Sequence, residues 1–288
     1  MAQATVVSCY YPLSNSKHSV EHYVQWIINF LTYVDSPIVM FSDGQVVDFI
    51  LDVRAKAGLQ DKLFLIRKPF NELKFSGEVW DTIWDSHVPM SSFAHIHNKE
   101  LFKIWANKSF FVQEAIAKNP FQTDYFVWCD AGCWRDQRIA SLCGPGWPVV
   151  SKIIPKKLHI LAIESIIPYF QQIVSQPAWS HEEMVRKIKT DNVVIVGGTI
   201  LLGDREAWAS WIPMVEATLL LFIQQNKFAG DDQAVLATTA LTLHIADKEH
   251  APIFYKKPIV APFFMGGGDI WFAFQQHFSS YDFKLEIY

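Results

Sequence analysis

Apolar residues recur at two different spacings along the first third of the chain. Three short runs rich in β-branched and aromatic residues predict strands: Ala4 to Tyr10, Ile38 to Phe41 and Leu63 to Ile66. Residues 20–31 repeat apolar positions at helical spacing, and a second helix is expected to end at Gly58. The alternation of strands and helices predicts an α/β fold with a mostly parallel central sheet, whose first half is Rossmann-like and binds a nucleotide.

A predicted strand near the middle of the chain ends in an acid. Tyr125 to Trp128 follows a helical pattern over His95 to Lys118 and has the continuous apolar character of a strand buried on both faces. Asp130, Ala131 and Gly132 come directly after it. Open α/β sheets bind ligands at the carboxyl ends of their strands, and small residues let a ligand approach the backbone. Asp also commonly begins the turn after a strand, so a ligand-binding acid and a turn residue stay as alternatives.

The pattern is less regular in the second half of the chain. A double glycine inside a predicted strand indicates a bulge or the close approach of another chain segment. The expected elements are a helix over 156–176, a strand over 192–202 that contains Gly197 and Gly198, a helix over 204–225, a helix opened by Gly230-Asp231-Asp232-Gln233, and extended chain over 252–262 before a glycine cluster at 266–268.

Composition narrows the class of protein. At 288 residues, with half of them hydrophobic and 19% charged, the chain suits one large domain with an extensive core. The formal net charge is −4 and there is no basic block, which argues against a nucleic-acid partner. Trp211 to Ile223 is too short for a membrane span and contains Glu216, and no signal peptide precedes the first strand. We therefore expect a soluble, cytoplasmic protein.

Cysteine and histidine give weak signals. Cys9, Cys129, Cys133 and Cys143 form no C-x-x-C pair, and their spacing matches none of the usual zinc patterns, so buried free thiols are expected. The pair His95-x-His97 has no matched acid beside it and is expected to lie at the surface or to cap a helix.

Acids and glycines gather at the ends of predicted elements. The acids at such ends are Asp43, Asp130 and the pair Asp231-Asp232. The glycines are Gly197-Gly198 and the cluster at 266–268. Acids hold ribose hydroxyls or a divalent cation, while backbone amides or the cation balance phosphate charge. The set predicts a nucleoside-diphosphate ligand. The G-x-G-x-x-G and Walker A patterns are absent, which argues against NAD-dependent chemistry and P-loop hydrolysis.

Four segments carry a resemblance to a known family. The run NKELFKIWANKSFFVQEAIAKNPFQTDYFVWCDAGCWRD, together with VVSCYYPL, VGGTILLGDREAW and GDDQAVLA, resembles the HtrL/YibB-like family of glycosyltransferases and, more distantly, GT-A enzymes in general. The resemblance implies a single GT-A-like domain over residues 1–288, with a nucleotide-sugar-binding half over 1–136 and an acceptor-binding half over 137–288. It also implies a nucleoside-diphosphate sugar donor, with a UDP-sugar as the first choice, and a glycan or glycoconjugate acceptor.

The resemblance assigns donor-binding residues. It places Asp130 at the first position of the GT-A D-x-D motif, as a ligand of Mn²⁺ or Mg²⁺, but Gly132 stands where the second acid would be. A cation held by one carboxylate would depend on water and phosphate oxygens, which Mg²⁺ accepts. Lys108 is expected to meet the diphosphate or else to be a solvated lysine on a helix face, and Lys99 is a second choice. The full donor set is Tyr10, Tyr11, Asp43, Lys108, Asp130, Ala131, Gly132 and Gly198.

The resemblance also places Asp231, Asp232 and Gln233 near the transferred sugar. One of the two acids could act as the general base that deprotonates the acceptor hydroxyl, if the neighbouring charge raises its pKa. Asp232 is the first choice because it directly precedes Gln233. The alternative is that the pair caps a helix.

Two further functions compete with sugar transfer. A binding module that has lost the second metal ligand would hold the nucleotide sugar or a glycan without turnover. A nucleotidyltransferase on a similar sheet would release pyrophosphate. The sequence leaves the sugar, the base, the stereochemistry and the oligomeric state open.

Overall fold

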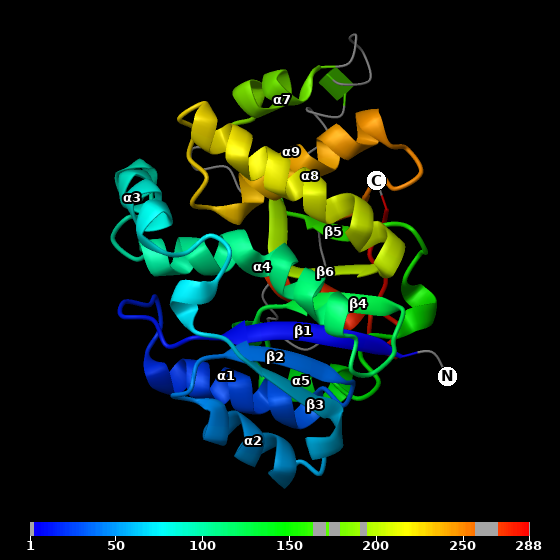
Figure 1. The fold of residues 1–288 in the computed structure, drawn as a ribbon. Helices are drawn as coiled ribbons and strands as arrows, with labels where there is room; N and C mark the ends of the chain where they lie inside the picture. The colour runs from blue at the N-terminus through cyan, green and yellow to red at the C-terminus, as the bar shows by residue number, and fades with distance from the viewer. Residues whose placement is uncertain (1–2, 164–170, 173–178, 191–194, 257–269, 288) are drawn as a thin grey trace.

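A seven-stranded sheet, in the order β3-β2-β1-β4-β6-β5-β7, crosses the middle of the computed structural model (Figure 1). The structure describes residues 3–163, 171–172, 179–190, 195–256 and 270–287. Within this sheet β6 runs antiparallel to both of its neighbours, and the other pairs are parallel. The predicted α/β fold with a mostly parallel sheet is therefore confirmed. The strands are β1 (Ala4–Tyr10), β2 (Ile38–Ser42), β3 (Leu63–Arg67), β4 (Tyr125–Cys129), β5 (His159–Ala162), β6 (Val196–Asp204) and β7 (Ile253–Lys256).

Helices cover both faces of the sheet, because successive strand residues point to opposite sides. Val7 and Val39 belong to one core, which packs on α3, α4, α7, α8 and α9, while Val6 and Met40 belong to the other, which packs on α1, α2, α5 and α10. Figure 1 shows α1, α2 and α5 on one side of the strands and α4, α8 and α9 on the other. The helices are α1 (Val20–Tyr33), α2 (Val47–Lys56), α3 (Glu78–His87), α4 (Lys99–Lys118), α5 (Gln137–Cys143), α7 (His181–Lys187), α8 (Arg205–Gln224), α9 (Asp232–Ala246) and α10 (Ala273–His277).

One predicted helix is wrong. His159 to Ala162, inside the helix expected over 156–176, is strand β5, and all four of its residues are buried between β6 and β7. Pairing with two strands distant in sequence overrides the local pattern. Residues 164–170 and 173–178 lie outside the described residues, as do 191–194 of the expected strand, 257–262 of the expected extended segment, and the glycine cluster at 266–268.

The division expected after residue 136 falls within one sheet. β4, from the first half, pairs with β6, from the second, over Tyr125 to Cys129. The two halves therefore share a sheet and both cores.

Helix α8 is a core helix. It is the one helix of the described part of the chain that is long and apolar enough to cross a membrane. Its Trp208 and Trp211 are fully buried, and their ring nitrogens donate to Phe126 O at 3.0 Å and to Ser109 Oγ at 3.1 Å. These hydrogen bonds connect α8 to β4 and α4.

Candidate active site

The reversal of β6 brings its beginning to the carboxyl end of β4. Cys129 pairs with Ile200, and the backbone N–H of Asp130 donates to Thr199 O at 2.8 Å. Gly198 therefore lies beside Asp130, although neither residue is near the other in sequence. The carboxyl end of β1 lies next to β4 in the same sheet.

Lys108 joins three segments at this edge. Its Nζ donates to Asp232 Oδ2 at 2.7 Å and to Gly198 O at 2.8 Å, and it lies 3.2 Å from Asp130 Oδ1. The Lys108 side chain is only 3% exposed. Burial opposes its charge, but Asp130 and Asp232 outweigh burial and raise the pKa of Lys108 above its ordinary value. Lys108 is thus an internal cation, and the alternative of a solvated lysine on a helix face is wrong.

Asp130 is not simply a turn residue. It precedes a 3-10 turn over Ala131–Cys133, but its side chain makes no capping hydrogen bond to that turn. Instead, Oδ1 accepts a hydrogen bond from Trp128 Nε1 at 2.7 Å, and the carboxylate contacts Lys108. Burial raises the pKa of Asp130, while Lys108 opposes this rise. The carboxylate therefore has defined partners within the site.

The two acids at the start of α9 have different surroundings. Asp231 is the N-cap residue, and its Oδ1 accepts from Gln233 N at 2.9 Å. Asp232 is the first helical residue, and its side chain, 10% exposed, forms the ion pair with Lys108. Burial, followed by repulsion from Asp232, raises the pKa of Asp231 to about 7. The expected capping role therefore belongs to Asp231. Asp232 instead belongs to a charge cluster that it forms with Lys108 and Asp130.

The lack of a side chain at Gly198 lets the Asp232 carboxylate approach the β6 backbone. A Cβ atom at Gly198 would overlap Asp232 Oδ2, whereas one at Gly197 would make ordinary contacts with Ile163. The close approach expected from the double glycine is confirmed at Gly198. At Gly132, a Cβ atom would lie 3.4 Å from ring atoms of both Trp26 and Tyr23.

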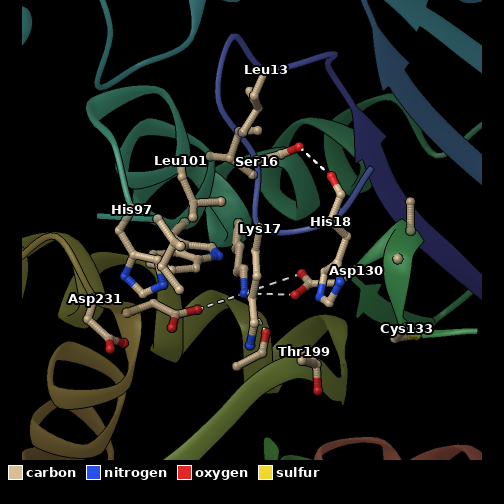
Figure 2. Close-up of a pocket in the computed structure, with 18 of the residues that line it drawn as sticks. Leu13, Ser16, Lys17, His18, His97, Leu101, Asp130, Cys133, Thr199 and Asp231 are labelled. Carbon is tan, nitrogen blue, oxygen red and sulfur yellow. Dashed lines mark hydrogen bonds and ion pairs between the residues drawn. The ribbon is translucent and has the colours of Figure 1, made fainter. Parts of the chain in front are cut away.

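One cavity of about 610 Å³ contains most of the expected site, and Figure 2 shows Asp130, Asp231 and Thr199 around it. Asp43 does not line this cavity, and its Oδ1 accepts from Gln45 N at 3.1 Å in a turn after β2. Lys99 forms an ion pair with Asp85 at 2.9 Å and does not line it either. The expected residues that do line it are Tyr10, Tyr11, Lys108, Asp130, Ala131, Gly132, Gly198, Asp231, Asp232 and Gln233.

Several lining residues escape prediction from the sequence. His97 precedes α4 and lines the cavity, with its ring 5.0 Å from that of Trp105, so it is not the surface or capping residue that was expected. Lys17, His18 and Arg135 also line the cavity. The polar segment after β1 is the signal that could have indicated Lys17 and His18, because loops at carboxyl strand ends form ligand sites.

The acids do not fit the usual two-carboxylate metal site. Lys108 already lies between Asp130 and Asp232, and position 132 offers no side-chain ligand. A cation bound there would compete with a buried ammonium group for the same oxygens.

A second group of potential metal ligands lies outside the residues that line the cavity. Ligand atoms of Glu206, Glu249 and His250 lie within 4.8 Å of one another. Lys156 Nζ already contacts both glutamates, at 3.2 and 2.7 Å, so a cation bound there would compete with this ammonium group. The four cysteines are buried free thiols, as expected.

Comparison with known sequences identifies the family. The profile of HtrL_YibB, described as a bacterial protein of unknown function, matches residues 4–244. The chain belongs to the HtrL_YibB family. The match covers all of the residues that line the cavity except Trp271 and Phe272, and it includes β4, β6 and the start of α9. A search of curated proteins finds no match.

Proposed function

We propose that this HtrL_YibB protein is a glycosyltransferase of the GT-A type, which moves a sugar from a nucleoside-diphosphate donor, first of all a UDP-sugar, to a glycan acceptor. The observation that carries the proposal is the meeting of Asp130, from the end of β4, with the acidic start of α9 inside one cavity. A strand-end acid suits donor hydroxyls, and an acid of raised pKa on a second element suits an acceptor proton.

We assign the general base to Asp231. The sequence favours Asp232, but the Asp232 carboxylate is already engaged in an ion pair with Lys108 at 2.7 Å. Asp231 has a pKa of about 7, close to the value at which a general base works best near neutral pH. Asp232 and Lys108 then act as positioning residues for Asp130 and the start of α9.

The proposed reaction is a single displacement. The acceptor hydroxyl oxygen attacks the anomeric carbon of the donor sugar, and its proton passes to Asp231. The bond between the anomeric carbon and the phosphate oxygen breaks, and the electron pair leaves with the nucleoside diphosphate. Asp130 orients the sugar or ribose hydroxyls, because its carboxylate oxygens accept hydrogen bonds that these hydroxyls donate. No step is assigned to Mn²⁺ or Mg²⁺, because the acids that would hold the ion already bind Lys108.

The alternatives predict different products. A non-catalytic binding module would bind the nucleotide sugar without releasing nucleoside diphosphate, and a nucleotidyltransferase would release pyrophosphate. The raised pKa of Asp231 favours catalysis over simple binding, because perturbed acids cluster at catalytic sites.

A thermal-shift screen with Asp130→Asn tests the proposal. Nucleoside diphosphates and their sugars should raise the melting temperature of the wild-type protein, because a ligand at 100 times its Kd stabilises a fold by about 2.7 kcal/mol. Asp130→Asn should stay folded, because Lys108 keeps Asp232 as an ion-pair partner, and it should respond less to nucleotide sugars and lose transfer. Equal transfer by Asp130→Asn and wild-type protein would contradict the role of Asp130.

A further inference from the structure

One wall of the cavity carries basic side chains that the proposed chemistry has not used. Lys17 and His18 come from the segment between β1 and α1, and Arg135 follows the 3-10 turn after Asp130. The acids come from β4 and α9. The cavity thus places a basic group of residues and an acidic group of residues within one ligand-sized space.

Arg135 is held in place by its neighbours. Its guanidinium carbon lies 4.4 Å from the ring centre of Trp26 and 4.9 Å from that of Phe272. Its Nε donates to Gly132 O at 3.3 Å. Stacking and this hydrogen bond orient the guanidinium plane, and an oriented guanidinium can bind a phosphate through two N–H groups.

His18 packs on the same Trp26 ring, and Lys17 precedes it in the chain. The His18 ring centre is 4.9 Å from that of Trp26, and Figure 2 shows Lys17 between His97 and His18. Among the described residues, Lys17 forms no ion pair, and His18 Nε2 is buried without a hydrogen-bond partner. Burial, and then the charges of Arg135 and Lys17, lower the pKa of His18. Lys17 and Arg135 both line the cavity with His18, so an anion bound beside His18 would meet two cationic side chains.

We propose that Lys17 and Arg135 bind the diphosphate of the donor, so that donor binding requires no divalent metal. This inference rests on the proposed function for the identity of the ligand, but the anion site itself can be tested without sugar transfer. Two protein cations replace the charge that a metal would otherwise supply, while Lys108 remains committed to Asp130 and Asp232. The arrangement also orients the donor, with its diphosphate toward Lys17 and Arg135 and its sugar toward the acids.

Calorimetric titration of the full chain with inorganic pyrophosphate and with UDP, both in excess EDTA, tests this site. The wild-type protein should bind both ligands. Lys17→Ala and Arg135→Ala should each weaken binding by about tenfold or more, which is the loss expected for one charge-assisted contact. Lys17→Arg should retain most of the affinity. Lys56→Ala is the matched control, because Lys56 is an exposed lysine of α2 that pairs with Asp52 away from the cavity.

The melting temperature of each free variant shows whether it is folded. Unchanged affinity in folded Lys17→Ala and Arg135→Ala would overturn the inference, as would binding of UDP only after Mn²⁺ is added. Pyrophosphate binding that depends on both residues, without any sugar transfer, would support the anion site while removing the proposed function. Transfer that depends on Asp231 but not on Lys17 or Arg135 would support the proposed function and contradict the anion site.

Discussion

At the scale of single residues, Lys108 decides the charge of the site. A buried ammonium between Asp130 and Asp232 leaves these two acids with one positive partner, and Asp231 adds a third acid whose pKa is raised. A buried pair contributes little net stability when intact, but removing one partner leaves an uncompensated charge. The three contacts of Lys108 therefore matter most when one of them is lost.

Lys108→Met should destabilise the protein by about 3 kcal/mol or more at pH 7, because it leaves the buried Asp232 without its cation. Denaturant unfolding measures the loss. Adding Asp232→Asn should recover part of the stability by removing the unpaired charge. A single variant as stable as the wild type would show that the Lys108 ion pairs contribute nothing to the folded state.

Asp231 should give the reaction its pH dependence. Its folded pKa of about 7 lies above the ordinary value of 3.8, because burial and Asp232 oppose ionisation. A base works when deprotonated, so turnover should rise through about pH 7 in the wild type. Asp231→Asn should lower turnover by ~10²- to 10⁴-fold and remove this rise.

The same pKa shift has a consequence for stability. A carboxyl group with a raised folded pKa leaves stability unaffected at low pH and destabilises the fold as pH rises from about 4 to above 7. Asn caps helices about as well as Asp, so Asp231→Asn should gain stability relative to the wild type between pH 4 and pH 8. Melting temperatures measured across this range check the sign, and a relative loss at high pH would contradict the assigned pKa.

At the scale of elements, β6 and α9 must approach closely at Gly198. Gly198→Ala should push Asp232 away from Lys108, cost about 1–3 kcal/mol of stability and abolish transfer. Gly197→Ala is a matched control on the same strand, since its added Cβ would lie 3.5 Å from an Ile163 side-chain atom. Denaturant unfolding and turnover measured for both variants test this contact. Equal effects of the two changes would mean that the approach of α9 at Gly198 is not special.

Local patterns predict elements well where pattern and packing agree. The apolar spacing of α1, α4 and α8 and the β-branched runs of β1 and β2 give these elements from sequence alone, within a few residues of their ends. β5 fails because its burial comes from β6 and β7, which are distant in the chain. Its short apolar run has no local feature that separates a strand from a buried helix.

In the candidate site, too, local sequence features are predictable and contacts between distant segments are not. The strand-end position of Asp130 and the acidic start of α9 are visible in the sequence, as is the double glycine. The bridge by Lys108 is not, because its partners lie 22, 90 and 124 positions away. Local sequence carries no information about contacts of this kind, so the sequence predicts for Lys108 only a contact with the ligand or with solvent.

At the scale of the whole molecule, one continuous sheet places both halves of the chain around one cavity. β1 and β4 bring the first half to it, and β6 and α9 bring the second. A net charge of −4 does not favour anionic substrates in general. Local placement of Lys17 and Arg135 is therefore what would draw a nucleoside diphosphate to this cavity.

The most direct measurement is product analysis with wild-type protein and Asp231→Asn, each supplied with UDP-sugars and glycan acceptors, in EDTA and in Mn²⁺. The account predicts that the wild type forms nucleoside diphosphate and glycosylated product in equal amounts. It also predicts that Asp231→Asn binds the same donor but makes ~10²- to 10⁴-fold less of both. Donor binding without either product, or release of pyrophosphate in place of nucleoside diphosphate, would contradict the assignment of sugar transfer to this cavity.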